Sequence, residues 1–133
     1  MTTDAATAVV TNYMRAVGDG DLELIRASFA YDATWVYPGD LPLSGTWQGR
    51  DAIVDEFLGQ LGVLLEPGAP LKIEVTSTLA VGDQVVAEWT SQATARGGVP
   101  FTNHNIAVFT VRDAKITSVR EYTDTQLAAR IFG

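Results

Sequence analysis

Residues 84–123 read QVVAEWTSQATARGGVPFTNHNIAVFTVRDAKITSVREYT. Apolar and polar residues alternate through most of this stretch, which is typical of β-strands that bury one face. Gly97-Gly98 and Asp113-Ala114 interrupt the alternation where a chain can reverse in a tight hairpin. Together with a similar run just before it, the pattern predicts an antiparallel meander. Its strands are expected at 71–81, 84–95, 100–112 and 115–123.

The N-terminal half follows a helical period instead. Apolar residues recur every three or four positions over 3–17 and again after Asp51, and a shorter helix is expected after Asp21. The remaining elements are a strand at 33–37, a loop at 39–49 and a terminal helix at 125–132. We therefore expect one α+β domain over residues 1–133. Its curved antiparallel or mixed sheet wraps around the N-terminal helices as a cone and encloses a pocket.

The amino-acid composition excludes several classes of function. The 133 residues carry 16 acidic against 9 basic side chains, a formal net charge of −7, which argues against binding to nucleic acid or anionic membranes. There is no cysteine and a single histidine, so thiolate chemistry is excluded and no metal or cofactor is expected. No signal-peptide pattern or membrane-length apolar run is found, and we expect a cytoplasmic protein.

The last hairpin supplies the candidate acid. With Asp113-Ala114 as a two-residue turn and strict alternation, Asn103 faces Asp124 and Asn105 faces Tyr122 across the strand pair. These polar residues share a face that becomes apolar nearer the turn, which suits a pocket with an apolar floor. A carboxyl group there is desolvated, which raises its pKa toward the range useful for acid/base catalysis. Asp124 is therefore the expected general acid/base.

Other residues complete the expected site. His104 falls on the opposite face of the sheet, and we interpret it as a surface residue unless a β-bulge reverses the face. A three-residue loop around Gly97-Gly98 would turn Trp89 inward, whereas a two-residue turn would turn it outward; the apolar character of Trp89 favours the first. Trp35 and Tyr37 point one way from the first strand, Trp35 into the core and Tyr37 toward a pocket rim.

The sequence resembles the SnoaL-like polyketide cyclases and ketosteroid-isomerase-related proteins of the NTF2-like superfamily. In the N-terminal half the similarity lies in the segment around Tyr13, in Phe29-Ala30-Tyr31-Asp32-Ala33-Thr34 and in Ser44-Gly45-Thr46. Near the C-terminus it lies in Asn103-His104-Asn105 and in Arg120-Glu121-Tyr122-Thr123-Asp124-Thr125, an ending that limonene epoxide hydrolases share. The resemblance implies a cone-shaped α+β barrel fold.

The resemblance also implies roles for particular residues. Tyr13 stands at the position of the isomerases' oxyanion-stabilising tyrosine, and Asp124 at that of the cyclase and epoxide-hydrolase acid/base. Tyr122 matches an aromatic residue near that acid. Tyr37 and Ala107 replace the two aspartates of the isomerases, so steroid isomerisation itself is not expected.

We therefore expect a cofactor-independent isomerase, cyclase or epoxide hydrolase acting on a small apolar carbonyl- or epoxide-bearing molecule. Its expected site residues are Asp124, Tyr13 and Tyr37 for catalysis, and Trp35, Trp89, Asn103, Asn105 and Tyr122 for substrate binding. The alternative is a non-catalytic ligand-binding or dimerisation module, in which Asp124 only caps the terminal helix. An outer sheet face with Ile106, Val108 and Val119 favours a homodimer.

Overall fold

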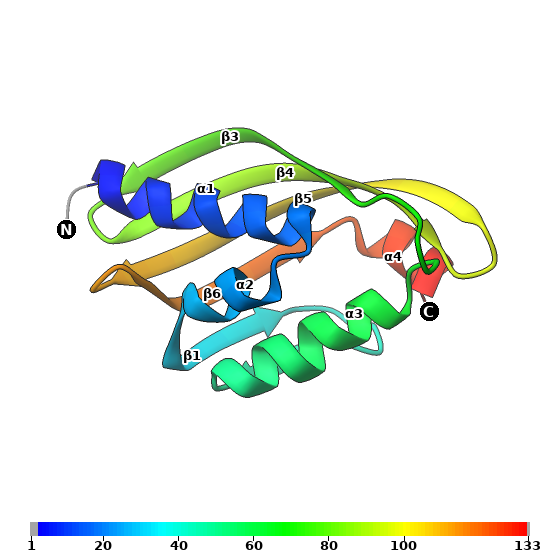
Figure 1. Cartoon of the computed structure of the whole chain (residues 1–133), viewed down its shortest axis with the longest axis horizontal. Helices are drawn as coiled ribbons and strands as arrows, with labels where there is room; N and C mark the ends of the chain where they lie inside the picture. Colours follow the sequence, from blue (N-terminus) through cyan, green and yellow to red (C-terminus); the bar gives the residue numbers. More distant parts are fainter. Residues whose placement is uncertain (1–2, 133) are drawn as a thin grey trace.

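A computed structural model describes residues 3–132 (Figure 1). The sheet has the strand order β2-β1-β6-β5-β4-β3, with β1 and β6 parallel and the other neighbours antiparallel. The elements are α1 (Thr3–Asp19), α2 (Leu22–Ala27), β1 (Phe29–Tyr37), β2 (Gly45–Gln48), the π-helix η1 (Ala52–Leu58), α3 (Gly59–Val63), β3 (Lys72–Val81), β4 (Gln84–Ala95), β5 (Val99–Arg112), β6 (Lys115–Thr123) and α4 (Thr125–Phe132). The α+β class and the mixed, curved sheet are as predicted, although the two edge strands do not pair to close a barrel.

Helix α1 covers the concave face of the sheet. It packs against strands β3 to β6 (Figure 1), and its buried residues form one helical stripe: Ala6, Val10, Tyr13, Met14 and Ala16. Gly20, with a φ of 69°, allows the chain to leave the helix. Asp21 then begins α2, its carboxylate accepting a hydrogen bond from the Leu24 N–H at 3.1 Å. No helix within residues 3–132 is long and apolar enough to cross a membrane.

The first strand is longer than predicted and has a partner that the sequence did not reveal. Strand β1 begins at Phe29, and β2 forms within the predicted 39–49 loop. The two strands pair antiparallel, with Trp35 opposite Trp47. Strand β2 has only four residues at the edge of the sheet, too few to establish a visible alternation.

The buried aromatic side chains form one cluster, which contains Trp35 as predicted. Trp35 lies 5.3 Å from Phe57 between ring centroids, and Tyr37 lies 5.5 Å from Phe57. Tyr13 contacts Phe29 edge to face at 5.2 Å. Such pairs contribute about 1 kcal/mol each beyond their buried area, so the cluster fixes how α1 and η1 sit on the sheet.

The hairpin between β5 and β6 departs from the predicted register. Asp113 and Ala114 form the expected two-residue turn, with φ values of 51° and 61°. Val111 lies opposite Ile116, but the next pair is Thr110 with Ser118, so Thr117 is an extra, bulged residue. Beyond the bulge Asn105 therefore lies opposite Thr123, and the predicted pairing of Asn105 with Tyr122 is wrong.

The bulge exchanges the two faces of β6. Val119 is fully buried in the core, so its predicted place on the outer face is wrong, and Glu121 lies on the inner face opposite the buried Ala107. Tyr122 lies on the outer face. The homodimer stays a prediction, now without Val119 in the surface that suggested it.

The hairpin between β4 and β5 follows the favoured alternative. Ala95 pairs with Val99, so a three-residue loop joins the strands, and Trp89 lies opposite Asn105. Trp89 is only 6% exposed, which confirms its predicted inward orientation. His104 is exposed, as predicted for a surface residue.

Candidate functional site

The concave face of the sheet encloses a cavity of about 460 Å³, which we call the main cavity. Helix α1, the η1–α3 segment and strands β1, β4, β5 and β6 contribute its walls. Most of the lining is apolar, including Met14, Val17, Trp35, Phe57, Trp89 and Phe101. A largely preformed apolar cavity with few polar groups is typical of a small-molecule site.

The polar groups gather where β4, β5 and β6 run side by side. Thr123 Oγ1 donates a hydrogen bond to Asn105 Oδ1 at 2.7 Å, and Asn105 Nδ2 donates to Ser91 Oγ at 3.2 Å. All three residues line the main cavity. Because both ends of the Asn105 amide are engaged by protein, the amide has a fixed orientation.

Asn103 differs from Asn105 in having a free donor. Its side chain is 7% exposed and its Oδ1 accepts a hydrogen bond from the His104 N–H at 3.0 Å. Within residues 3–132 its Nδ2 group has no protein partner. Since Asn103 lines the main cavity, this amide can donate to a carbonyl or hydroxyl oxygen of a bound molecule.

Glu121 places a carboxyl group in this cavity. Burial raises the pKa of Glu121 to about 7, although a hydrogen bond from the Trp35 indole to its carboxylate, at 3.3 Å, acts in the opposite direction. Among residues 3–132, Glu121 is the one acidic side chain in the lining of the main cavity. A carboxyl group with such a pKa is present in both protonation states near neutral pH, as a proton shuttle requires.

Two tyrosines stand near this carboxyl group. Burial, and secondarily the negative charge of Glu121, raise the pKa values of Tyr13 and Tyr37 well above the ordinary value of 10. Both residues line the main cavity. Their hydroxyl groups therefore stay protonated at any ordinary pH and serve as hydrogen-bond donors.

The structure brings together six of the eight predicted site residues. Those lining the main cavity are Tyr13, Trp35, Tyr37, Trp89, Asn103 and Asn105. Asp124 and Tyr122 are the exceptions. Tyr122 is 49% exposed on the outer face, and Asp124 is exposed while its Oδ1 accepts a hydrogen bond from the Leu127 N–H at 3.1 Å.

The expected inward orientation of Asp124 is therefore wrong. The bulge at Thr117 shifts the register of β6 by one residue, and Asp124 instead caps the first turn of α4, the alternative that its position before Thr125 had suggested. Its predicted acid/base role loses its geometric basis, and the same shift brings Glu121 inward.

A signal for Glu121 was present in the sequence. Ile116 and Val119 are both fully buried although they are three residues apart, and strict alternation cannot place two such residues on one face. An apolar spacing of three within a strand indicates a bulge.

For metals, no group of three or more His, Cys, Asp or Glu side chains within residues 3–132 is placed to hold an ion.

Comparisons with known structures support the fold. An NTF2-like protein from Burkholderia xenovorans LB400 is 28% identical, with 100% of this chain and 99% of that chain covered and a TM-score of 0.78. Bal32a, from a soil-derived mobile gene cassette, has a TM-score of 0.87 at 23% identity, with 98% of each chain covered. TerC, co-crystallised with polyporic acid, is 27% identical, with 96% and 98% of the two chains covered and a TM-score of 0.83.

Sequence comparison gives the family. No curated protein shows significant similarity to the chain. The model of the SnoaL-like domain, however, matches residues 10–119, which contain all strands of the sheet except the end of β6. The chain thus belongs to the SnoaL-like domain family and has the NTF2-like fold.

Proposed function

We propose that the protein is a cofactor-independent enzyme that moves a proton on a small apolar carbonyl compound, with Glu121 as general acid/base. The observation that carries this proposal is the carboxyl group of Glu121, which lies in the wall of an apolar cavity. Burial raises the pKa of this group to about 7. The fold family supports a small organic guest, and TerC, a structural relative, was co-crystallised with polyporic acid.

The proposed step begins with ionised Glu121. Its carboxylate removes a proton from the carbon next to the substrate carbonyl, and the C–H electron pair moves to form an enolate. Tyr13 or Tyr37 donates a hydrogen bond to the enolate oxygen, and the Asn103 Nδ2 group is a third available donor. Where the substrate has a C=C bond in the β,γ position, the enolate is a dienolate, and protonated Glu121 returns the proton to the γ-carbon, which moves the double bond into conjugation with the carbonyl group. If the enolate carbon instead attacks a second carbonyl carbon in the same molecule, a ring closes, the π electrons of that carbonyl group move to its oxygen, and protonated Glu121 protonates the new alkoxide.

A single carboxyl group favours proton transfer over epoxide opening. Among the described residues that line the main cavity, Glu121 is the one with a carboxyl group, and none is an arginine. Opening an epoxide needs one group to activate water and another to protonate the leaving oxygen. Among the expected reactions, we therefore favour isomerisation or cyclisation.

The proposal is tested with 5-nitrobenzisoxazole, which opens to a coloured phenolate once a base removes its C–H proton. The wild-type protein is expected to accelerate this elimination with a pH midpoint near 7, set by Glu121. Glu121→Gln keeps the shape but removes the base, and should reduce the rate at least a hundredfold.

Asp124→Asn is the matched control, because it removes an exposed carboxylate and retains a capping side chain. It should leave the rate unchanged. If Glu121→Gln were as fast as the wild type, Glu121 would not be the base and the proposal would fail. If the wild type bound the probe without accelerating its elimination, the proposal would also fail, and the alternative of a non-catalytic binding module would stand.

A further inference from the structure

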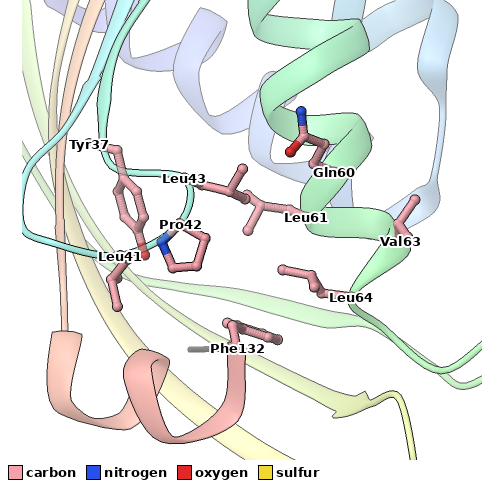
Figure 2. Close-up of a pocket in the computed structure, with 9 residues that line it drawn as sticks. All are labelled: Tyr37, Leu41, Pro42, Leu43, Gln60, Leu61, Val63, Leu64 and Phe132. Atoms are coloured by element: carbon pink, nitrogen blue, oxygen red, sulfur yellow. The ribbon is translucent and has the colours of Figure 1, made fainter.

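A second cavity adjoins the main cavity, and we call it the side cavity. Its volume is about 220 Å³, and it lies between the loop after β1, the end of α3 and α4 (Figure 2). Leu41 and Leu43 come from the loop and Leu64 from the end of α3, and Figure 2 shows these side chains gathered around one space. The lining is strongly apolar, with Gln60 and the Tyr37 hydroxyl as its polar groups.

The two cavities share part of their walls. Tyr37, Leu61 and Phe132 line both of them. Tyr37 is also one of the proposed donors to the reacting carbonyl, so the side cavity begins beside the proposed chemistry. The apolar space of the side cavity therefore lies next to the part of the main cavity that Tyr37 lines.

The wall contributed by the loop is preformed. The backbone N–H of Leu41 donates to Ser44 Oγ at 2.9 Å, and the Ser44 N–H donates to the Leu41 carbonyl at 3.0 Å. The Trp47 indole donates to the Leu43 carbonyl at 3.1 Å. These bonds satisfy backbone groups of the loop within the protein, so its leucine side chains can face the cavity without an ordering cost on binding.

We propose, resting on the function proposed above, that the side cavity binds a hydrocarbon branch of the same molecule whose carbonyl group lies at Glu121. The substrate class is then a carbonyl compound with an alkyl or aryl branch beside the reacting carbon. The side cavity has about half the volume of the main cavity, enough for a branch of several carbons. Each methylene group buried there should improve affinity about fourfold.

A homologous series of alkyl phenyl ketones, from acetophenone to octanophenone, tests this assignment by calorimetry. In the wild-type protein, affinity should rise about fourfold per methylene and stop rising once the side cavity is full. Leu64→Trp fills the side cavity from a residue that does not line the main cavity. It should abolish the gain with chain length and leave acetophenone affinity unchanged.

Leu64→Ala enlarges the side cavity instead of filling it. This second variant keeps the proposal testable if Leu64→Trp does not fold. It should move the end of the affinity gain to longer chains. Equal gains in all three proteins, or no gain with chain length in the wild type, would overturn the assignment. The same series of ketones is measured with Glu121→Gln, because binding of the branch does not need the base. The gain in affinity with chain length should therefore be retained in this variant. If it is retained while the wild-type protein shows no turnover, the proposed reaction is wrong but the assignment of the side cavity holds.

Discussion

Trp35 and Glu121 lie on neighbouring parallel strands, and the indole N–H of Trp35 donates a hydrogen bond to Glu121 Oε1 at 3.3 Å. The bond favours the ionised carboxylate, whereas burial favours the protonated acid. Burial is the larger effect, and the balance holds the pKa of Glu121 at about 7. The Trp35 side chain thus both lines the main cavity and lowers the pKa of the carboxyl group within it.

Replacing Trp35 should shift the pH profile. Trp35→Phe keeps an aromatic ring but removes the donor, so the pKa of Glu121 and the pH midpoint of 5-nitrobenzisoxazole elimination should both rise above 7. Trp89→Phe is the control, since Trp89 lines the same cavity without a hydrogen bond to Glu121 among the described residues. An unchanged midpoint in Trp35→Phe would show that the indole does not set this pKa.

The same pKa predicts how stability depends on pH. Because the pKa of Glu121 is raised on folding, from 4.5 to about 7, its contribution to stability is present at low pH and is lost as the pH rises through 7. Glu121→Gln lacks this loss. Between about pH 5.5 and pH 8, the variant should gain about 2 kcal/mol relative to the wild type.

Urea unfolding at the two pH values measures this difference, and the other titrating groups cancel because both proteins share them. A stability difference that does not vary with pH would mean that Glu121 has an ordinary pKa in the folded protein.

Asp124 should affect stability but not turnover. Its carboxylate caps α4 through the Leu127 N–H, so Asp124→Ala should cost about 1 kcal/mol of unfolding free energy. Asp124→Ser keeps a capping oxygen and should recover most of that loss. Denaturant titration gives the energies, and the elimination assay should give wild-type rates for both variants. A large loss of rate in the serine variant would reopen a catalytic role for this acid.

Thr123 should hold the polar end of the cavity in place. Thr123→Val removes the hydroxyl that donates to Asn105 Oδ1 at 2.7 Å while keeping the side-chain shape. The unfolding free energy should fall by about 1 kcal/mol, and affinity for acetophenone should fall as the Asn105 amide loses its fixed orientation. Thr102→Val, at an exposed position, should change neither quantity. Equal effects of the two substitutions would indicate a loss of β-strand stability unrelated to the cavity.

Much of the architecture follows from local patterns. The period of two over residues 84–112, the Asp113-Ala114 turn and the apolar character of Trp89 predict the strands, the hairpin and the inward face of β4, and the structure agrees. These features depend on neighbours in the sequence, where physical preferences act directly.

The errors arise where a single extra residue, or a partner far away in the sequence, determines the strand register or the burial of a side chain. Alternation assumes that each residue adds one position to the register, so it fails after Thr117 and misplaces Asp124, Glu121 and Val119. Strand β2 forms only because β1 offers it an edge. The raised pKa of Glu121 depends on its burial by elements far away in the chain. The spacing of residues within one hairpin does not predict that burial.

The bulge at Thr117 also makes β6 tolerant of losing one residue. With Thr117 deleted, Ile116 would be followed directly by Ser118, and strict alternation would still turn Val119 and Glu121 inward. Loss of one codon beside the turn would thus leave the carboxyl group in the cavity. A deletion that reverses the faces of an ordinary strand is absorbed here by the extra residue.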